Sequence, residues 1–459
     1  MKEEHAAKLN KMGVEPIPKL LLSMSWPAIL SMTIAALYNM VDSIYVSRIS
    51  EDALTAVSYI IPLQFIMISL AVGTGVGVNS LIARKLGARR FEEANRTAET
   101  SLVLSVFNWL IFASIGIFLA KPFMGIYTDD EVIFSYAVEY LRIVTIFSFC
   151  AITEINLEKV LQSTGNMIAP MIISLSGCVT NIILDPVFIF GYFGVPRLEV
   201  KGAAIATVIG QTVSLIVAVF ILKTREHAVQ FNMKEFRLDW GIIRDIYSVA
   251  LPSIVMQSVA SVVLIAYNWI LSATPVAVAV LGVYGKIESF VFMPVFGLQQ
   301  GALPLMAYNF GARNKKRMMD TLKMSILISL IIISIGTAIF QLAPELPLSL
   351  FHAEGEMMEL GIAALREISL CFIPAAIGIS IGTTFQATGH GIYMLIESLI
   401  RQVVGVLPLA YFLYNFYGPK YTFYSYPLAE ILGMIFGAVL FVYLYNKEIK
   451  NLNRVEICD

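Results

Sequence analysis

Residues 168–192 read IAPMIISLSGCVTNIILDPVFIFGY, a run in which Asp185 is the only charged residue. A helix needs about 20 consecutive apolar residues to cross the roughly 30 Å of hydrocarbon in a bilayer. Because lipid offers backbone N–H and C=O groups no hydrogen-bonding partner, a run of this length can cross only as a helix. The stretch therefore predicts a transmembrane helix, and its one carboxylate indicates a function, since a charge inside a membrane is costly.

The composition extends this prediction to the whole chain. Hydrophobic residues make up 58% of the sequence, charged residues make up 14%, and the mean hydropathy is +0.76. These values exclude an ordinary soluble domain. Long apolar runs predict an all-α integral membrane protein with twelve transmembrane helices, at about 18–46, 52–83, 95–120, 132–163, 168–192, 200–222, 243–271, 278–308, 318–342, 357–386, 392–416 and 423–446.

The basic residues predict how the chain is oriented. Three loops on one side carry five Lys or Arg each: Arg84, Lys85, Arg89, Arg90 and Arg96; Lys223, Arg225, Lys234, Arg237 and Arg244; Arg313, Lys315, Lys316, Arg317 and Lys323. The loops on the other side carry five altogether: Arg48, Lys121, Arg197, Lys201 and Lys420. By the positive-inside rule, the basic loops and both termini are cytoplasmic. No cleavable signal peptide is expected, and the four cysteines (Cys150, Cys178, Cys371 and Cys458) indicate free thiols rather than disulfides.

The chain repeats itself at an offset of about 224 residues. KLGARR at 85–90 corresponds to NFGARN at 309–314, and LQSTGN at 161–166 corresponds to FQATGH at 385–390. Two halves of six helices would begin and end on the same side, which predicts two pseudo-symmetric six-helix bundles with a cleft between them. We expect an N-lobe at 1–223, a cytoplasmic connector at 224–242 and a C-lobe at 243–459. Features shared by both halves are most simply scaffold, and features of one half are better functional candidates.

Two aspartates are present in the first half only. Asp42 aligns with Tyr267 or Asn268, and Asp185 aligns with Leu407, whereas Pro186 keeps a counterpart in Pro408. Both aspartates come late in helices that run outward, so they are expected at similar depth.

Polar residues accompany both aspartates. Asn181 shares a helical face with Asp185, and Tyr38 and Asn39 flank Asp42, which makes these two residues candidates for a substrate cavity. Two carboxylates with amide and hydroxyl oxygens predict either a hard-cation site or a pair that shares a proton. The alternative for Asp185 is a helix cap, because Asp before Pro commonly begins a helix.

Other intramembrane charges lie in the second half. Glu397 and Arg401 are four residues apart and are expected to pair with each other. Lys286, Glu288 and Glu430 are either members of internal ion pairs or substrate-cavity residues.

Several catalytic signatures are absent from the sequence. None of the four histidines (His5, His227, His352 and His390) lies inside a helix core, and no H-E-x-x-H motif or G-x-x-x-x-G-K-[ST] phosphate loop occurs. We therefore expect no enzyme activity, no cofactor and an ion gradient as the energy source.

The sequence resembles the multidrug and toxic compound extrusion (MATE) transporters of bacteria. The resemblance covers nearly the whole chain and is carried by Pro27 with VDSIYVS at 41–47, ARKLGARR at 83–90, QSTGN at 162–166, NIILDP at 181–186 and GAAIAT at 202–207. It implies export of cationic, amphipathic drugs or toxic compounds through the cleft in exchange for H⁺ or Na⁺.

The resemblance also implies roles for individual residues. Asp42, Asn181 and Asp185 would bind the coupling proton or Na⁺, with Tyr140 and Thr207 nearby, and helix 1 would bend at Pro27. Coupling carboxylates in the second lobe, which some members have, are not expected, since only Glu367 beside Arg366 is available there.

Three other interpretations stay open. A major facilitator transporter also has two six-helix halves, but the acidic residue of its usual loop motif is missing from ARKLGARRFEE. A lipid-linked oligosaccharide flippase of the same superfamily would more often have fourteen helices and a cationic cavity, and a membrane enzyme would need a catalytic cluster.

The expected partners are small organic cations and membrane lipid, with no nucleic acid. The expected form is a monomer that crosses a bacterial plasma membrane many times.

Overall fold

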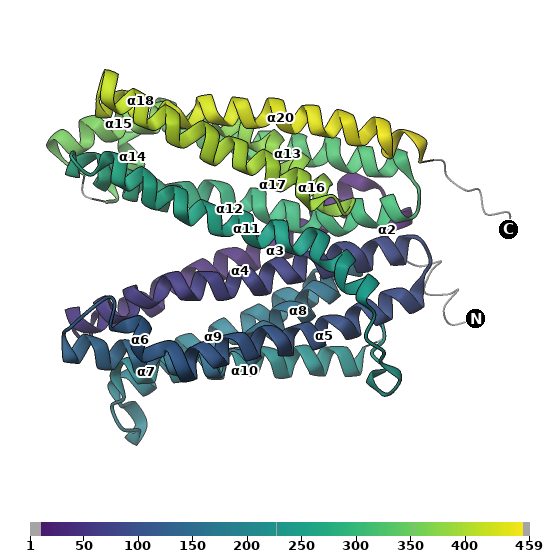
Figure 1. The fold of residues 1–459 in the computed structure, drawn as a ribbon, viewed down its shortest axis with the longest axis horizontal. Coiled ribbons are helices and arrows are strands. Elements are labelled where there is room, and N and C mark those ends of the chain that lie inside the picture. Colours follow the sequence, from purple (N-terminus) through teal and green to yellow (C-terminus); the bar gives the residue numbers. More distant parts are fainter. Residues whose placement is uncertain (1–10, 226, 352, 453–459) are drawn as a thin grey trace. The chain divides into compact units, whose positions relative to one another are not determined.

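The computed structural model describes residues 11–225, 227–351 and 353–452, and over these residues it is helical with no strand. Figure 1 shows the long helices, which lie alongside one another within each half of the chain. The unbroken spans are α3 (Ile17–Ser47), α4 (Glu51–Gly87), α9 (Ile168–Phe190), α10 (Glu199–Thr224), α11 (Trp240–Leu271), α12 (Pro275–Gly311), α13 (Lys315–Leu342) and α20 (Ser425–Lys447). They agree with the apolar runs of the sequence to within a few residues at each end.

Two spans are bent pairs of helices. The first joins α7 (Glu131–Ile146) to α8 (Phe149–Ser163), and the second joins α15 (Gly355–Ser369) to α16 (Phe372–Ala387), each with a bend of 45°. The sequence predicted each pair as one run, and both breaks fall at positions related by the repeat. Ten helices or continuous helical stretches among the described residues are long and apolar enough to cross a membrane, and the two pairs raise this number to twelve.

Two other spans contain π-helical turns. The first runs from α5 (Phe91–Ser114) through a π segment at Ile115–Leu119 into α6 (Ala120–Met124). The second runs from α17 (Gly391–Leu399) through a π segment at Ile400–Val406 into α18 (Leu407–Tyr417), and it carries Pro408 just after the π segment. A proline removes one backbone donor, and a π turn is one way for the preceding carbonyls to adjust. α9 passes Pro186 without a π turn, so the two repeats differ at this point.

The short elements complete the helical inventory of the described residues. They are α2 (Lys11–Val14), α14 (Glu345–Ser349), α19 (Pro419–Thr422) and three 3₁₀ turns at Tyr192–Gly194, Met233–Glu235 and Ile449–Asn451.

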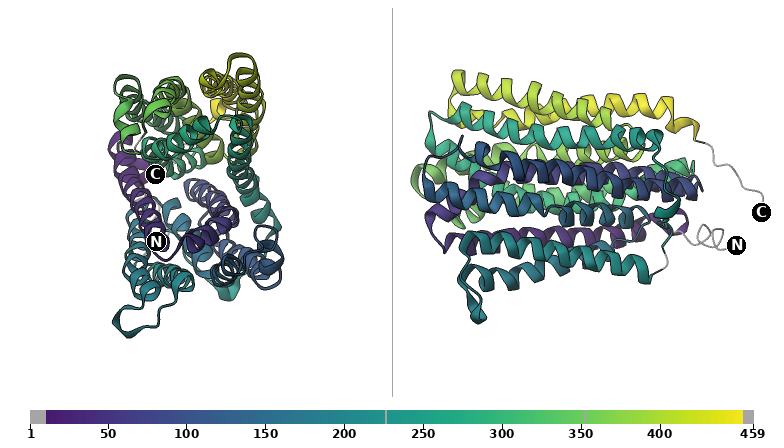
Figure 2. Two further views of the ribbon diagram at one scale, coloured as in Figure 1. Left: turned by 90° about the vertical axis from the view of Figure 1, so that its left-hand side faces the viewer. Right: turned by 60° about the horizontal axis from the view of Figure 1, so that its bottom comes forward.

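The chain divides into two compact units, and each has its own apolar core. Among the described residues, one unit comprises 30–82 and 90–246, and the other comprises 11–29, 83–89 and 247–452. The helices of each unit can be followed by colour in Figure 2. The core of the first unit includes the buried Ile60, Leu141 and Val200, and that of the second includes Phe340, Phe372 and Phe423. The lobe boundaries given by the sequence stay predictions, because packing groups residues 11–29 and 83–89 with the second half of the chain.

The repeated motifs adopt repeated backbone conformations. Arg89 and Arg313 both have left-handed φ values, of 59° and 53°, and Gly165 and Gly389 have φ values of 85° and 86°. In the second unit, a Cβ on Gly87 would lie 1.9 Å from the carbonyl oxygen of Tyr308, and a Cβ on Gly311 would lie 2.0 Å from the carbonyl oxygen of Arg84. The offset of 224 residues relates these two contacts to each other. The glycines are therefore required by close backbone approach, which supports the interpretation of these motifs as scaffold.

Candidate functional site

Asp185 lies inside a helix. α9 continues past Pro186 to Phe190 and ends at Gly191, whose φ of 79° is the left-handed conformation typical of a helix end. The side chain of Asp185 is 0% exposed. The helix-cap alternative for Asp185 is therefore wrong, and the carboxyl group is held within the first unit.

The carboxyl group of Asp42 reaches the same place from α3. This half-buried side chain lies within hydrogen-bonding reach of the Asp185 carboxyl group. Two carboxylates this close repel each other strongly unless a proton or a cation lies between them. The structure thus brings together two residues that are far apart in the sequence.

Hydroxyl and amide groups surround this pair of aspartates. Asn181 donates from Nδ2 to Oγ1 of Thr207 at 3.3 Å, and all of these side chains except that of Asp42 are almost completely buried. The hydroxyl groups of Tyr38 and Tyr140 also lie beside Thr207. The structure therefore gathers six of the expected residues, Tyr38, Asp42, Tyr140, Asn181, Asp185 and Thr207, and we call this group the aspartate site.

The structure changes the set of site residues that the sequence predicted in two ways. Asn39 is exposed, on a different face of α3 from Tyr38, so it does not join the aspartate site. Gln64 of α4 does, since its side chain lies beside the Tyr140 hydroxyl group. Nothing in the sequence around Gln64 distinguished it from other polar residues in long apolar helices.

The aspartate site has more acceptors than donors. Oδ1 of Asp42, Oδ1 and Oδ2 of Asp185 and Oδ1 of Asn181 are buried and have no hydrogen-bond donor among the described residues. Leaving one buried polar atom unpaired costs about 1–3 kcal/mol, so four acceptors in one place favour binding of a positively charged group there. Oxygen atoms of this kind suit a proton or a hard cation such as Na⁺. No group of three or more His, Cys, Asp or Glu within the described ranges could hold a metal ion.

The charges of the second half form a separate cluster. Nε of Arg401 lies 3.4 Å from Oε1 of Glu397, which confirms the expected pair, and Nη1 of Arg401 lies 3.0 Å from Oε2 of Glu430. Glu288 lies beside the Tyr284 hydroxyl group. Glu430 is therefore a member of an internal ion pair.

Two other positions of the second half bear on the asymmetry between the repeats. Lys286 is exposed and its Nζ lies 5.7 Å from the centre of the Phe351 ring. Tyr267, which aligns with Asp42, is fully buried, and its hydroxyl group is 3.0 Å from both the carbonyl oxygen of Thr422 and Oγ of Ser425. A satisfied neutral group thus occupies the place of an unsatisfied carboxylate.

A polar cluster on α8 was missed by the sequence analysis. Oγ of Ser174 donates to Oε1 of Glu158 at 2.6 Å, and Nζ of Lys159 donates to Oε1 of Gln162 at 3.0 Å. Glu154 lies beside Ser214. The sequence did carry a signal for this cluster, since Glu154, Glu158 and Lys159 are three of the five charged residues inside the apolar run 132–163.

Three cysteines and two histidines lie within the described residues. Cys150, Cys178 and Cys371 are free thiols, as expected, and His227 and His390 lie outside the long helices. His5, His352 and Cys458 lie outside the described residues, as do both chain termini.

Long apolar helices together with a buried pair of acidic side chains are typical of membrane transporters. The chain is a member of the MATE family of multidrug efflux transporters, because the MatE family profile matches residues 27–187 and 252–412. The two matched segments begin at Pro27 and Pro252, so they confirm the internal repeat.

Known proteins similar to this chain agree with the assignment. An FAD transporter of Shewanella oneidensis is 26% identical over 401 residues, which cover 86% of this chain and 88% of that protein. The multidrug export protein MepA of Staphylococcus haemolyticus is 25% identical over 427 residues, which cover 93% of each chain. An outward-facing multidrug resistance MATE transporter of the MOP superfamily superposes with a TM-score of 0.87 at 25% identity, over 97% of this chain and 98% of that one.

Proposed function

We propose that this MATE transporter is a secondary active antiporter that exports cationic, amphipathic compounds in exchange for H⁺ or Na⁺ bound at the aspartate site. The observation that carries the proposal is the set of four buried, unpaired oxygens on Asp42, Asn181 and Asp185. A bound proton or Na⁺ would satisfy several of these oxygens at once. Two acidic groups in close contact favour binding of the coupling ion, because a proton or a cation relieves their repulsion.

The coupling mechanism follows from competition. Binding of the ion neutralises the Asp42–Asp185 pair, and binding of an organic cation is favoured when the pair is charged. A ligand shifts a conformational equilibrium only by its difference in affinity for the two states, so the charge of the aspartate site is what links ion and substrate.

Pro27 supplies a place where α3 can bend. It is buried inside α3, and the division of the chain into compact units falls between Ile29 and Leu30, in the same helix. Proline removes the backbone donor that the carbonyl of Ser23 would otherwise use, so it weakens the helix there. We infer that α3 rearranges near Pro27 when the aspartate site changes its charge.

The charges of the chain favour one class of substrate. The FAD transporter of Shewanella shows that a similar protein carries a compound of quite different chemistry. In this chain the unpaired groups of the aspartate site are acidic, and the basic Arg401 is already paired with Glu397 and Glu430. This distribution favours an organic cation.

Orientation and assembly are also part of the proposal. We propose that both termini lie in the cytoplasm of a bacterial cell, which the basic loops support through the positive-inside rule, and that the protein acts as a monomer surrounded by membrane lipid.

Transport by purified protein in liposomes tests the proposal. Ethidium is loaded on one side, and a Na⁺ gradient and a pH gradient are imposed separately. We expect one gradient to drive ethidium accumulation at least tenfold above the level without a gradient. Transport that neither gradient changes would refute antiport, and accumulation of FAD but not of ethidium would refute the cationic substrate class.

A further inference from the structure

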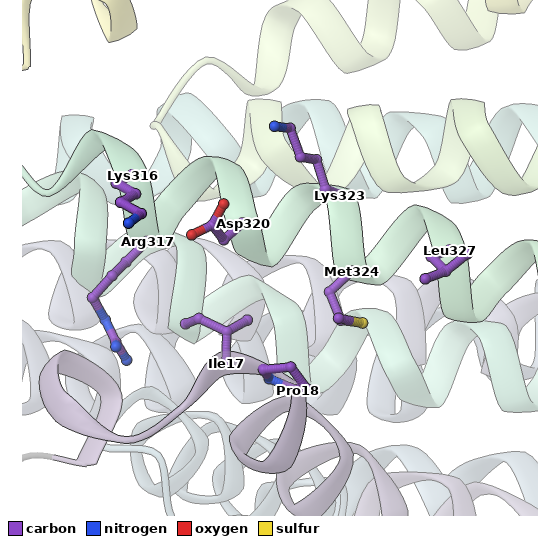
Figure 3. Close-up of a pocket in the computed structure, with 8 residues that line it drawn as sticks. All are labelled: Ile17, Pro18, Lys316, Arg317, Asp320, Lys323, Met324 and Leu327. Atoms are coloured by element: carbon purple, nitrogen blue, oxygen red, sulfur yellow. The ribbon is translucent and has the colours of Figure 1, made fainter.

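A cavity of about 530 Å³ lies between the start of α3 and the first turns of α13, inside the second unit. Figure 3 shows its lining, with Lys316, Asp320 and Lys323 on α13 and with Ile17 and Pro18 at the beginning of α3. Deeper along α13 the lining becomes apolar, at Met324 and Leu327. The cavity therefore changes from charged to apolar along a helix that enters the membrane.

The charged and apolar parts of the lining together extend over a length that suits a lipid molecule rather than a small anion. From Lys316 to Leu327 the helix rises about 16 Å at 1.5 Å per residue. The charged end lies next to the basic loops, where the polar headgroups of the bilayer are. Leu327 is 52% exposed, which is suitable for contact with an acyl chain.

The charges around the cavity select the headgroup. Lys316 and Lys323 are exposed and form no ion pair with a carboxylate of the described residues, although Asp320 lies between them on the same helix. Two lysines suit a phosphate group, and basic pockets between helices on the cytoplasmic side bind acidic lipids. Asp320 repels a second negative charge and accepts hydrogen bonds from hydroxyl groups. A headgroup with one negative charge and with hydroxyl donors satisfies all three side chains.

Arg317 maintains the opposite wall of the cavity. Its Nη2 donates to the carbonyl oxygens of Met12 at 3.0 Å and of Glu15 at 2.8 Å. Nδ2 of Asn309 donates to the same carbonyl oxygen of Met12 at 3.1 Å. These bonds hold the chain just before Ile17 against α13, so the wall is present before any ligand binds.

We propose that this cavity binds a singly charged, hydroxyl-bearing phospholipid of the phosphatidylglycerol type. Its phosphate contacts Lys316 and Lys323, its glycerol hydroxyls donate to Asp320, and its acyl chains run along Met324 and Leu327. A bound lipid bridges the start of α3 and α13. This site is independent of the aspartate site, whose residues are all in the other unit.

Native mass spectrometry of the full-length protein in detergent tests the proposal. Dioleoylphosphatidylglycerol, dioleoylphosphatidic acid, dioleoylphosphatidylcholine and inorganic phosphate are each titrated into four proteins. These are wild type, the double variant Lys316→Gln/Lys323→Gln, the variant Asp320→Asn and the control Lys234→Gln/Arg237→Gln. The control removes the same charge from exposed residues of the loop between α10 and α11.

We expect the double variant to bind phosphatidylglycerol about thirtyfold more weakly, since each lysine near an anionic lipid contributes a factor of about five. The control should stay within twofold of wild type. Asp320→Asn should reduce the preference for phosphatidylglycerol over phosphatidic acid.

Equal binding of phosphatidylglycerol and phosphatidylcholine by wild type, or unchanged binding by the double variant, would refute the site. Displacement of the lipid by equimolar inorganic phosphate would show a free-anion site instead, and size-exclusion chromatography confirms that each variant is folded.

Discussion

Gly87 of α4 is packed against the carbonyl group of Tyr308 so closely that even a methyl group would lie 1.9 Å from the oxygen. Gly311 makes the equivalent contact with the carbonyl oxygen of Arg84, and the internal repeat relates the two contacts. Backbone atoms cannot move aside as the end of a side chain can, so both positions depend on the absence of a Cβ.

We therefore expect Gly87→Ala and Gly311→Ala to destabilise the protein, each by about 1–3 kcal/mol or more, because overpacking forces the backbone apart. The measurement is the thermal unfolding midpoint in detergent. Gly282→Ala in α12 is the matched control, since no atom lies within 4 Å of the place that its methyl group would take and alanine is the better helix former there. Equal midpoints for Gly87→Ala and Gly282→Ala would contradict the close approach.

Removing either charge of the aspartate site should abolish export. We expect Asp42→Asn and Asp185→Asn, each at normal expression, to leave a pump-deficient bacterium unable to expel ethidium, because neither variant keeps two ionisable carboxyl groups. Efflux is followed by the loss of ethidium fluorescence from preloaded cells. Asp129→Asn removes an exposed carboxylate from the same half of the chain and should export normally. Wild-type efflux by Asp42→Asn or Asp185→Asn would mean that coupling occurs elsewhere.

The same site should make ion and substrate compete. Adding the coupling ion, either NaCl or a step from pH 8 to pH 6, should release bound ethidium from purified wild-type protein, as measured by fluorescence anisotropy. In Asp185→Asn the release should fall at least tenfold, because only one ionisable carboxyl group remains to bind the ion. If the variant released the same amount of ethidium, the coupling ion would not bind at Asp185.

If α3 bends at Pro27, replacing this proline should leave the protein stable but slow its transport of ethidium. Pro27→Ala restores a backbone donor in α3, so we expect an unchanged or raised unfolding midpoint and at least a tenfold loss of ethidium transport. Pro62→Ala in α4, at an exposed position inside a helix, provides the comparison and should transport normally. Equal transport rates for the two variants would show that α3 does not need to bend at Pro27.

The ion pairs of Arg401 should matter for stability. Arg401→Met leaves Glu397 and Glu430 without their partner in a mostly buried place, and we expect a loss of about 2–4 kcal/mol in the free energy of unfolding. Arg96→Gln breaks an exposed pair with Glu92 and should cost less than about 1 kcal/mol. Similar losses in the two variants would show that Arg401 is well solvated.

The sequence could predict the helices because the backbone groups of each apolar run form their hydrogen bonds within the same helix. The runs around Asp185 and Gly87 are long enough to identify without knowing which helices pack against them. Comparison of the two repeats showed that Asp185 has an apolar counterpart, Leu407, in the second half. The bends at 147–148 and 370–371 were missed, because hydrophobicity is continuous through both breaks.

What the sequence by itself determined is a twelve-helix membrane chain with two halves and with two acidic residues that one half alone carries. Only the tertiary structure decided that Asp42 and Asp185 meet, that Gln64 joins them and Asn39 does not, and that Glu430 is neutralised by Arg401. The physical reason is that depth along a helix follows from residue number, whereas the face a side chain presents to another helix depends on how the helices pack.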